Sequence, residues 1–498
     1  MRLSILDRAI FLQIFVIISL LMMIPSIVAF VEKDYFVGRT FLYSSCAGIF
    51  VYLLISIALS NIPRTPNNFE KLVSFVLSYL FLPIFMAMPV VLSLDYVHFL
   101  DGWLEMVSAF STTGLNLITV GTLNGSAFHL WLAMVSWVGG IFFWICAISI
   151  LLPLNISRFE FGVTDFAGGP LNKGHESSNA VINCARQLIP VYVVITISLW
   201  LLLTLSGLPG FKALIMAMSV ISTSGFEASS YDPSNIFITE GIILLFFVFA
   251  FSKSLFTRDI NDIKKFRIFK DPEIRLALII ISAVTLLFFA NSLIVLISEN
   301  TDISPVILIK HLWGIFFTVT SYLVTMGNES NVWFNEPYSP QAEMTLVALM
   351  GLAIIGGGVA TTAGGVKLLR VYILYRNAAQ EVDMMLHPNS IPSKKGKGLI
   401  SDNKNNRLMA WIFFMLFIAA LAFFTLIFSM LFDDIRPGLA LSVSALTTTG
   451  PLFLNAGYEI VITDINQIFK FLLGIAMILG RLEILVIVAL LSPSVWSK

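Results

Sequence analysis

Charged residues and cysteines are both scarce in this sequence. Only 12% of its 498 residues are Asp, Glu, Lys or Arg, whereas soluble domains contain about 25%. The three cysteines, Cys46, Cys146 and Cys184, lie in or beside apolar segments without metal-type spacing, so we expect buried thiols and no disulfide framework. These shortages exclude an ordinary soluble domain and a disulfide-stabilised secreted scaffold.

Sequence motifs of enzyme chemistry are also missing. The five histidines form no His-Glu-x-x-His motif, and no glycine-rich loop ends in the Lys-Ser or Lys-Thr that would bind a phosphate. No apolar segment carries arginine at every third position, so a voltage-sensor helix is not expected. We therefore predict that the chain is not an enzyme and that nucleic acid is not a partner.

Apolar residues, in contrast, are abundant. They make up 57% of the chain, and the mean hydropathy is +0.90. A membrane-spanning helix needs roughly 20 apolar residues, and the chain offers about a dozen candidate segments. The first apolar run, Ala9 to Val31, is too long for the core of a signal peptide, so we expect a retained helix. The composition predicts an all-α, multi-pass membrane protein in contact with lipid.

One short pattern, Ser-x-x-x-Thr-x-Gly, occurs four times at nearly equal spacing. By chance it would occur on the order of 0.2 times in a chain of this length. Four evenly spaced copies therefore indicate an internal repeat. We call each copy a frame, and the four frames end at Gly114, Gly225, Gly327 and Gly450.

Each frame closes a short apolar segment that lies between two longer ones. A segment of about 8 to 12 helical residues, at ~1.5 Å each, crosses only half of a bilayer. Non-helical backbone at membrane depth is tolerated only where it lines a cavity or is buried in protein. We predict re-entrant pore helices, each followed by a filter segment, at Phe99 to Phe110, Phe211 to Ile221, Leu312 to Leu323 and Leu439 to Leu446.

The repeat divides the chain into a leading helical pair, residues 1–66, and four units at 67–181, 182–272, 273–404 and 405–498. Each unit is predicted to contain a first membrane helix (M1), a pore helix and a second membrane helix (M2), arranged around a pseudo-fourfold axis. Glycine lets carbonyl oxygens turn inward and threonine adds hydroxyl oxygens, so four such segments could replace the water shell of a small cation. The pore-helix dipoles would also favour a cation in the cavity.

Basic residues suggest the orientation in the membrane. The frame-bearing stretches contain few basic residues beyond Lys212, Lys310, Arg436 and Lys470. The polar connections between spans that carry no frame, in contrast, are rich in Lys and Arg. The positive-inside rule then predicts cytoplasmic termini and filters that open outward. We expect the outer acids to concentrate cations at the mouth, unless they are ordinary solvated loop residues. These acids include Asp101, Glu105 and Glu329.

Two features lie outside the frames. Five glycines and two threonines between Gly356 and Gly365 interrupt the M2 segment of the third unit. They predict a broken helix with a mobile loop that could obstruct the pore, or else close packing of helices through small residues. Arg481 lies within the last apolar segment, at an insertion cost of about 2.5 to 3.5 kcal/mol. It would limit cation flow or hold the loop, or else form a structural ion pair.

Four further stretches, together with the frames, match a known family of membrane proteins: GGGVATTAGGVKLLR, MILGRLEI, FRIFKDPEIR and LHPNSIP. The whole chain resembles the Trk/Ktr/HKT superfamily of potassium transporters, most closely its TrkH type. The resemblance implies a homodimer in the bacterial inner membrane that takes up potassium through one pore per subunit. It also implies gating by a cytosolic ring of TrkA-type RCK subunits. The nucleotide would bind only to that partner, and this chain would bind potassium and no other cofactor.

The resemblance also implies which residues act. The ion ligands would be Thr112, Thr113, Gly114, Thr223, Ser224, Gly225, Thr325, Met326, Gly327, Thr448, Thr449 and Gly450. The gate would consist of Gly356, Gly357, Gly358, Thr361, Thr362, Gly364, Gly365, Lys367 and Arg481.

Two frames depart from the family pattern. In the third, Met326 would offer only its backbone carbonyl and Asn328 replaces the usual aromatic residue, which favours looser selectivity. In the fourth, Pro451 follows the glycine. In the plant relatives of this superfamily, a serine in place of the first filter glycine goes with sodium transport. All four glycines are present here, so the resemblance implies potassium over sodium. The alternative function is a sodium-coupled solute symporter, which predicts an inverted repeat, whereas these four units run in the same orientation.

Overall fold

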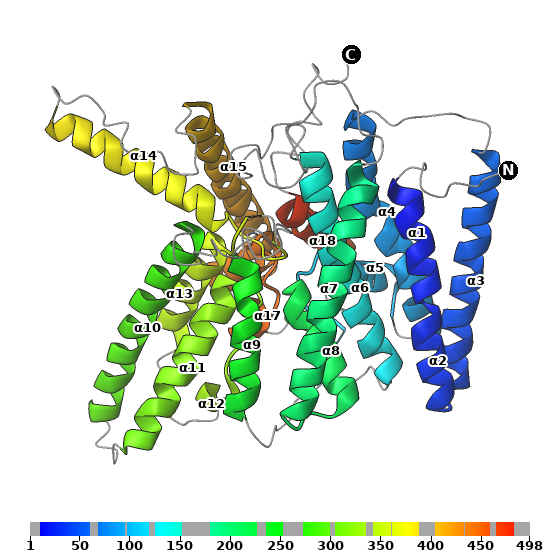
Figure 1. The fold of residues 1–498 in the computed structure, drawn as a ribbon, viewed down its shortest axis with the longest axis horizontal. Helices are drawn as coiled ribbons and strands as arrows, with labels where there is room; N and C mark the ends of the chain where they lie inside the picture. Colours follow the sequence, from blue (N-terminus) through cyan, green and yellow to red (C-terminus); the bar gives the residue numbers. More distant parts are fainter. Residues whose placement is uncertain are drawn as a thin grey trace.

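The computed structural model describes residues 10–59, 68–94, 97–118, 125–151, 180–226, 236–251, 272–298, 304–334, 342–359, 361–387, 404–432, 434–458 and 465–482. Within these ranges the chain forms helices and no strands (Figure 1). Eight of the described helical segments are long and apolar enough to cross a membrane. The all-α membrane fold predicted from the sequence is therefore confirmed.

The leading pair contains one interruption that the sequence analysis did not predict. Its first span consists of α1 (Ile10–Leu21) and α2 (Met23–Val31) instead of one helix. Pro25 has no N–H to donate to the carbonyl four residues earlier, so the helical hydrogen-bond ladder is broken there. The second helix, α3 (Tyr35–Ala58), begins after Asp34, whose carboxylate accepts a backbone N–H of the first turn.

The helices of the four units follow in chain order. The first unit has α4 (Asn68–Ser93), α5 (Phe99–Phe110) and α6 (Ser126–Cys146), which continues as a π-helical turn (Ala147–Leu151). The second has α7 (Ala180–Leu205), α8 (Gly210–Ser222) and α9 (Ile236–Phe251). The third has α10 (Pro272–Ser298), α11 (Pro305–Leu323), α12 (Asn331–Phe334), α13 (Ala342–Ile355) and α14 (Leu368–Leu386). The fourth has α15 (Lys404–Ser429), α16 (Ile435–Thr447), α17 (Pro451–Asn455) and α18 (Gln467–Leu482).

The four pore helices are α5, α8, α11 and α16. The first has the predicted ends, and α8 is one residue longer at each end. The third, α11, has 19 residues and is longer than a half-crossing. It starts early because Ser304 caps its N-terminus and Pro305 occupies the first turn, where a missing N–H costs nothing.

The packing of the pore helices closes the four units into a ring. Each pore helix contacts the M2 helix of the preceding unit: α8 packs on α6, α11 on α9, and α16 on α13. The first pore helix, α5, packs on α18 at the other end of the chain. This contact completes a cyclic order of four, as expected for a pseudo-fourfold arrangement.

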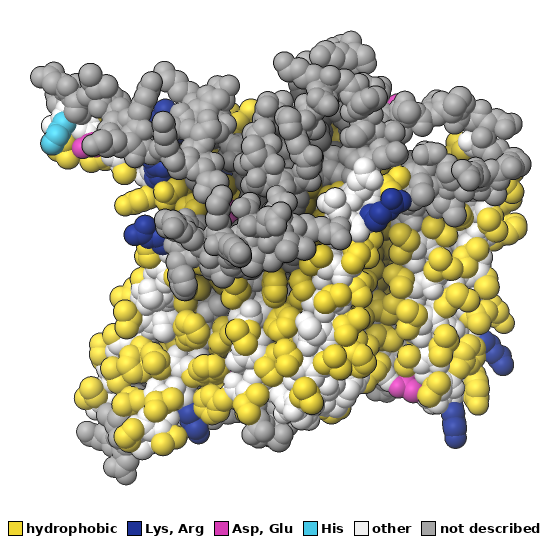
Figure 2. Space-filling model, viewed as in Figure 1, with side chains coloured by type: hydrophobic (Ala, Val, Ile, Leu, Met, Phe, Trp, Pro, Cys, Tyr) yellow, Lys and Arg dark blue, Asp and Glu magenta, His cyan; other side chains and the backbone are white. Residues whose placement is uncertain are grey.

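The outer surface of the ring is apolar. Figure 2 shows hydrophobic side chains over most of the visible helical face, with few Lys or Arg. Leu205 is 82% exposed and Leu287 is 69% exposed, values that are normal where lipid replaces water. By contrast, 94% of the most apolar stretch of α6 is buried, compared with 22% for α10. Thus α6 lies in the interior of the bundle, and α10 forms part of its rim.

Candidate ion filter and gate

All four pore helices end in the same backbone turn. The N–H that follows each frame threonine donates to the carbonyl of the frame serine, at 2.9 to 3.0 Å. This bond is typical of a Schellman turn, in which the capping residue is left-handed and is usually glycine. Here it is a β-branched residue each time, which is a strained choice that proteins retain mainly at functional sites. The φ angles are 58° at Thr112, 54° at Thr223, 62° at Thr325 and 56° at Thr448.

The filter glycines of the first two units each touch the next unit. A Cβ atom placed on Gly114 would collide with the backbone carbonyl of Ser224. A Cβ atom on Gly225 would collide in the same way with the carbonyl of Met326. Both glycines have a φ of 71°. Only glycine therefore allows these segments to approach so closely.

The remaining two filter segments continue the same order. A Cβ atom on Gly327 would lie 2.8 Å from the Thr449 methyl carbon. The Gly450 N–H donates to the carbonyl of Thr113, with 2.6 Å between nitrogen and oxygen. The fourth segment is thus bonded to the first. These contacts bring together the four filter segments that carry the twelve residues named by the resemblance as ion ligands, in the cyclic order of the units.

The atoms gathered in this ring are backbone carbonyl and hydroxyl oxygens. All twelve residues are buried. The hydroxyls of Thr112 and Thr448 are fully buried and have no hydrogen-bond partner among the described residues. Within those same ranges, no group of three or more His, Cys, Asp or Glu could hold a metal. Neutral oxygen donors in this arrangement suit a monovalent cation stripped of its water.

The glycine-rich stretch forms a loop between α13 and α14, so the predicted helix break is present. The Gly364 N–H donates to the hydroxyl of Thr325, at 2.7 Å. The Thr362 hydroxyl donates to the carbonyl of Ile221 at the end of α8, at 3.1 Å. A Cβ atom on Gly364 would also meet the Thr447 carbonyl and the Thr448 hydroxyl. The loop therefore contacts the C-terminal ends of three of the four pore helices.

Arg481 holds this loop from α18. Its side chain is only 2% exposed, and Nη1 donates to the carbonyl of Thr362, at 2.6 Å. The guanidinium carbon also lies 4.1 Å from the centre of the Phe143 ring, a cation–π contact. Lys367 ends the loop, and its ammonium donates to the Ala363 carbonyl. Arg481, Thr362 and Lys367 are thus brought together.

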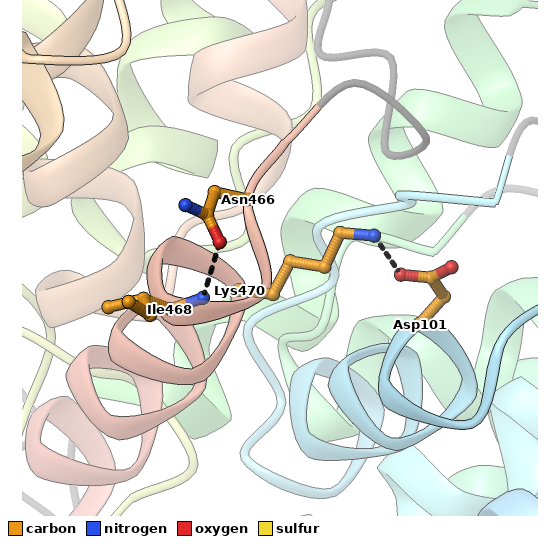
Figure 3. A network of polar contacts seen from close by, with 4 residues as sticks. All are labelled: Asp101, Asn466, Ile468 and Lys470. Carbon is orange, nitrogen blue, oxygen red and sulfur yellow. Dashed lines mark hydrogen bonds and ion pairs between the residues drawn. The ribbon is translucent and has the colours of Figure 1, made fainter.

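The prediction for the acids at the mouth was wrong for two residues. Asp101 and Glu105 are only 3% and 1% exposed, so they present no charge to solvent. Asp101 forms a 2.5 Å ion pair with Lys470 of α18 (Figure 3). Glu105 accepts the backbone N–H of Leu117, three residues beyond the first filter glycine, at 3.0 Å. Glu105 therefore holds the backbone just beyond the first filter, whereas Asp101 anchors the start of α5 to α18. A buried carboxylate is stable only with such partners.

A third acid of that set, Glu329, is also largely enclosed. Burial raises the pKa of its carboxyl to about 7, and a hydrogen bond from the Tyr322 hydroxyl, at 3.3 Å, opposes the shift. Sequence analysis did not identify two further residues near the third filter, Glu240 and Asn455. In the sequence each is only a polar residue within or at the end of an apolar segment, which does not reveal its partner.

The comparisons with known proteins bear on the family and the fold. A family model described as "TrkH: Cation transport protein" matches residues 49–498. The chain is 28% identical over 413 residues to the Trk system potassium uptake protein TrkH of Halomonas elongata, covering 80% of each chain. It is 26% identical to an uncharacterized cation transporter of Methanocaldococcus jannaschii, covering 95% of this chain and 92% of the relative. Its fold is similar to the crystal structure of the potassium transporter TrkH from Vibrio parahaemolyticus, with a TM-score of 0.80, 21% identity and complete coverage of both chains.

Proposed function

This chain belongs to the TrkH family of cation transport proteins, and from that premise we propose that it takes up potassium across the inner membrane through a gated pore within one chain. The observation that carries the proposal is the ring of four filter segments, closed by the bond from Gly450 to Thr113. Oxygens held in such a ring can replace the hydration shell of an ion of one size. The Trk relatives named for potassium uptake support potassium as that ion.

The twelve ring residues are the proposed ion ligands, with backbone carbonyls as the main donors. Potassium is the cargo, so its binding must be weak enough for release. The strained left-handed threonines would hold their carbonyls in place before an ion arrives, so little reorganisation is needed when it binds. The first pore helix is further anchored by the buried pair of Asp101 and Lys470.

The loop from Gly356 to Gly365 is the proposed gate. It lies against the pore-helix ends and is held by Arg481, so ions can pass only when it moves. The positive charge of Arg481 would also repel a cation that approaches from the filter. Only Val366 and Lys367 separate the loop from α14, which starts at Leu368, so a force on α14 would reach the gate through a short connection.

The family also suggests the assembly. We propose a homodimer that is gated by a cytosolic TrkA-type RCK partner, with the nucleotide on that partner. The helix α14 suits such a contact because it projects from the bundle (Figure 1) and exposes Tyr375 and Met385, at 67% and 80%. Cytoplasmic termini and outward-facing filters remain predictions of the positive-inside rule.

The experiment is ion flux into liposomes that contain the purified protein. We expect potassium to enter faster than sodium at equal gradients, and no organic solute to accumulate. Equal rates for the two ions would overturn the proposal. The alternative, a sodium-coupled solute symporter, has no support in the comparisons and would instead show solute uptake that requires sodium.

A further inference from the structure

The two frames that depart from the family pattern meet in the structure. Pro451 follows the fourth filter glycine and starts the short helix α17. Its ring lies 2.6 Å from the position that a Cβ atom would occupy on Gly225, and 3.4 Å from the corresponding position on Gly327. The last residue of α17, Asn455, therefore reaches the third filter, which carries the other departure.

Asn455 bonds directly to the third filter glycine. Its Nδ2 donates to the carbonyl of Gly327, at 2.9 Å, and lies 3.2 Å from the Tyr322 hydroxyl. That hydroxyl donates onward to Glu329, at 3.3 Å. A carbonyl can only accept, so the amide must face it with its nitrogen. Gly327 and Tyr322 are buried, whereas Asn455 lies at the surface of the mouth.

The third filter segment is also held on the side away from Asn455. Ser330, three residues beyond Gly327, donates to the buried carboxylate of Glu240 on α9, at 2.8 Å. The N–H of Asn331 donates to that carboxylate as well, at 3.1 Å. Trp313 of α11 adds a third bond to it, at 2.8 Å. The outer part of the third filter is thus tied to the second and fourth units.

We infer that Asn455 is a specificity-determining residue, a positioning group that keeps the Gly327 carbonyl from moving toward a smaller ion. The inference rests on the proposed filter function. A carbonyl oxygen has two lone pairs, so the bond to Asn455 leaves one for a cation. Sodium is smaller than potassium and needs its ligands to move inward, and the tether to α17 opposes that movement. The tether would offset the looser selectivity expected from Met326.

The test is Asn455→Asp, which keeps the shape but places an acceptor against the carbonyl. We expect the potassium-to-sodium flux ratio in liposomes to fall about fivefold, the effect of losing one ordinary hydrogen bond. The matched control is Asn466→Asp, which adds the same charge at an exposed asparagine that caps α18 (Figure 3) and should leave the ratio unchanged. A purely structural role would lower both ion fluxes equally and leave the ratio intact.

A second variant keeps the inference testable if the first yields no protein. Tyr322→Phe removes only the hydroxyl between Asn455 and Glu329, and a smaller fall in the ratio is expected. If the wild type is selective and the available variant retains its ratio, the inference is wrong and the proposed function stands. If the wild type itself shows no preference for potassium, the proposed function fails first.

Discussion

Arg481 donates a hydrogen bond to the backbone carbonyl of Thr362 across a distance of 2.6 Å. The bond joins the last described helix, α18, to the loop of the third unit, 119 residues earlier in the chain. Both partners are buried. The contact therefore fixes the loop against the filter, and its removal should release the loop.

Replacing Arg481 tests the gate. Arg481→Gln should raise potassium flux at equal protein amounts, because a hydrogen bond from a charged group contributes about 1.5 to 3 kcal/mol. That energy corresponds to roughly a 10- to 100-fold shift toward the open loop. The measurement is flux into liposomes without a partner protein. Arg481→Lys keeps the charge and should give an intermediate rate; an unchanged rate in the glutamine variant would contradict the gate.

The position of the loop can be tested with a methyl group. Gly364→Ala would force a Cβ atom into the Thr447 carbonyl and the Thr448 hydroxyl, so the loop can no longer lie against the filter. We expect increased flux. The matched control is Gly351→Ala in α13, where a Cβ atom meets nothing within 4 Å and alanine suits the helix. The account is wrong if both variants behave alike.

The ion pair of Asp101 and Lys470 should contribute to the stability of the folded chain. Lys470→Met leaves a buried carboxylate without its cation, which costs about 3 to 5 kcal/mol. The midpoint of thermal unfolding in detergent should fall clearly, and Asp101→Asn in the same chain should restore most of the loss. Arg436→Gln is the control, because its pair with Asp434 is 60% and 58% exposed and such pairs contribute at most about 1 kcal/mol. Equal midpoints for all three variants would refute this role.

The sequence was most informative where a local cause sets the structure. The ends of α5 agree with the prediction because an apolar run stops at the frame, and the break after Ile355 follows from consecutive glycines, which disfavour a helix. The start of α11 at Pro305 was missed because the apolar pattern alone does not show that Ser304 is a cap.

Contacts between distant residues could not be predicted in the same way. Asp101 and Lys470 are 369 residues apart, so nothing local pairs them. From sequence, Asp101 and Glu105 therefore resembled solvated acids of the mouth. The bond from Asn455 to Gly327 depends on the direction of α17. Pro451 starts this helix, but the direction of the helix also depends on the position of the fourth filter. Such residues become recognisable when the ring order of the units is known.

The central claim, that four filter segments select one ion around a common axis, is tested most directly at Gly114. The measurement is the potassium-to-sodium flux ratio of Gly114→Ser relative to the wild type in liposomes. Gly114 has a φ of 71° and no room for a Cβ atom beside the Ser224 carbonyl, and strain of this kind costs on the order of 1 to 3 kcal/mol. We predict a ratio at least about tenfold lower in a protein that still folds. An unchanged ratio would contradict the account.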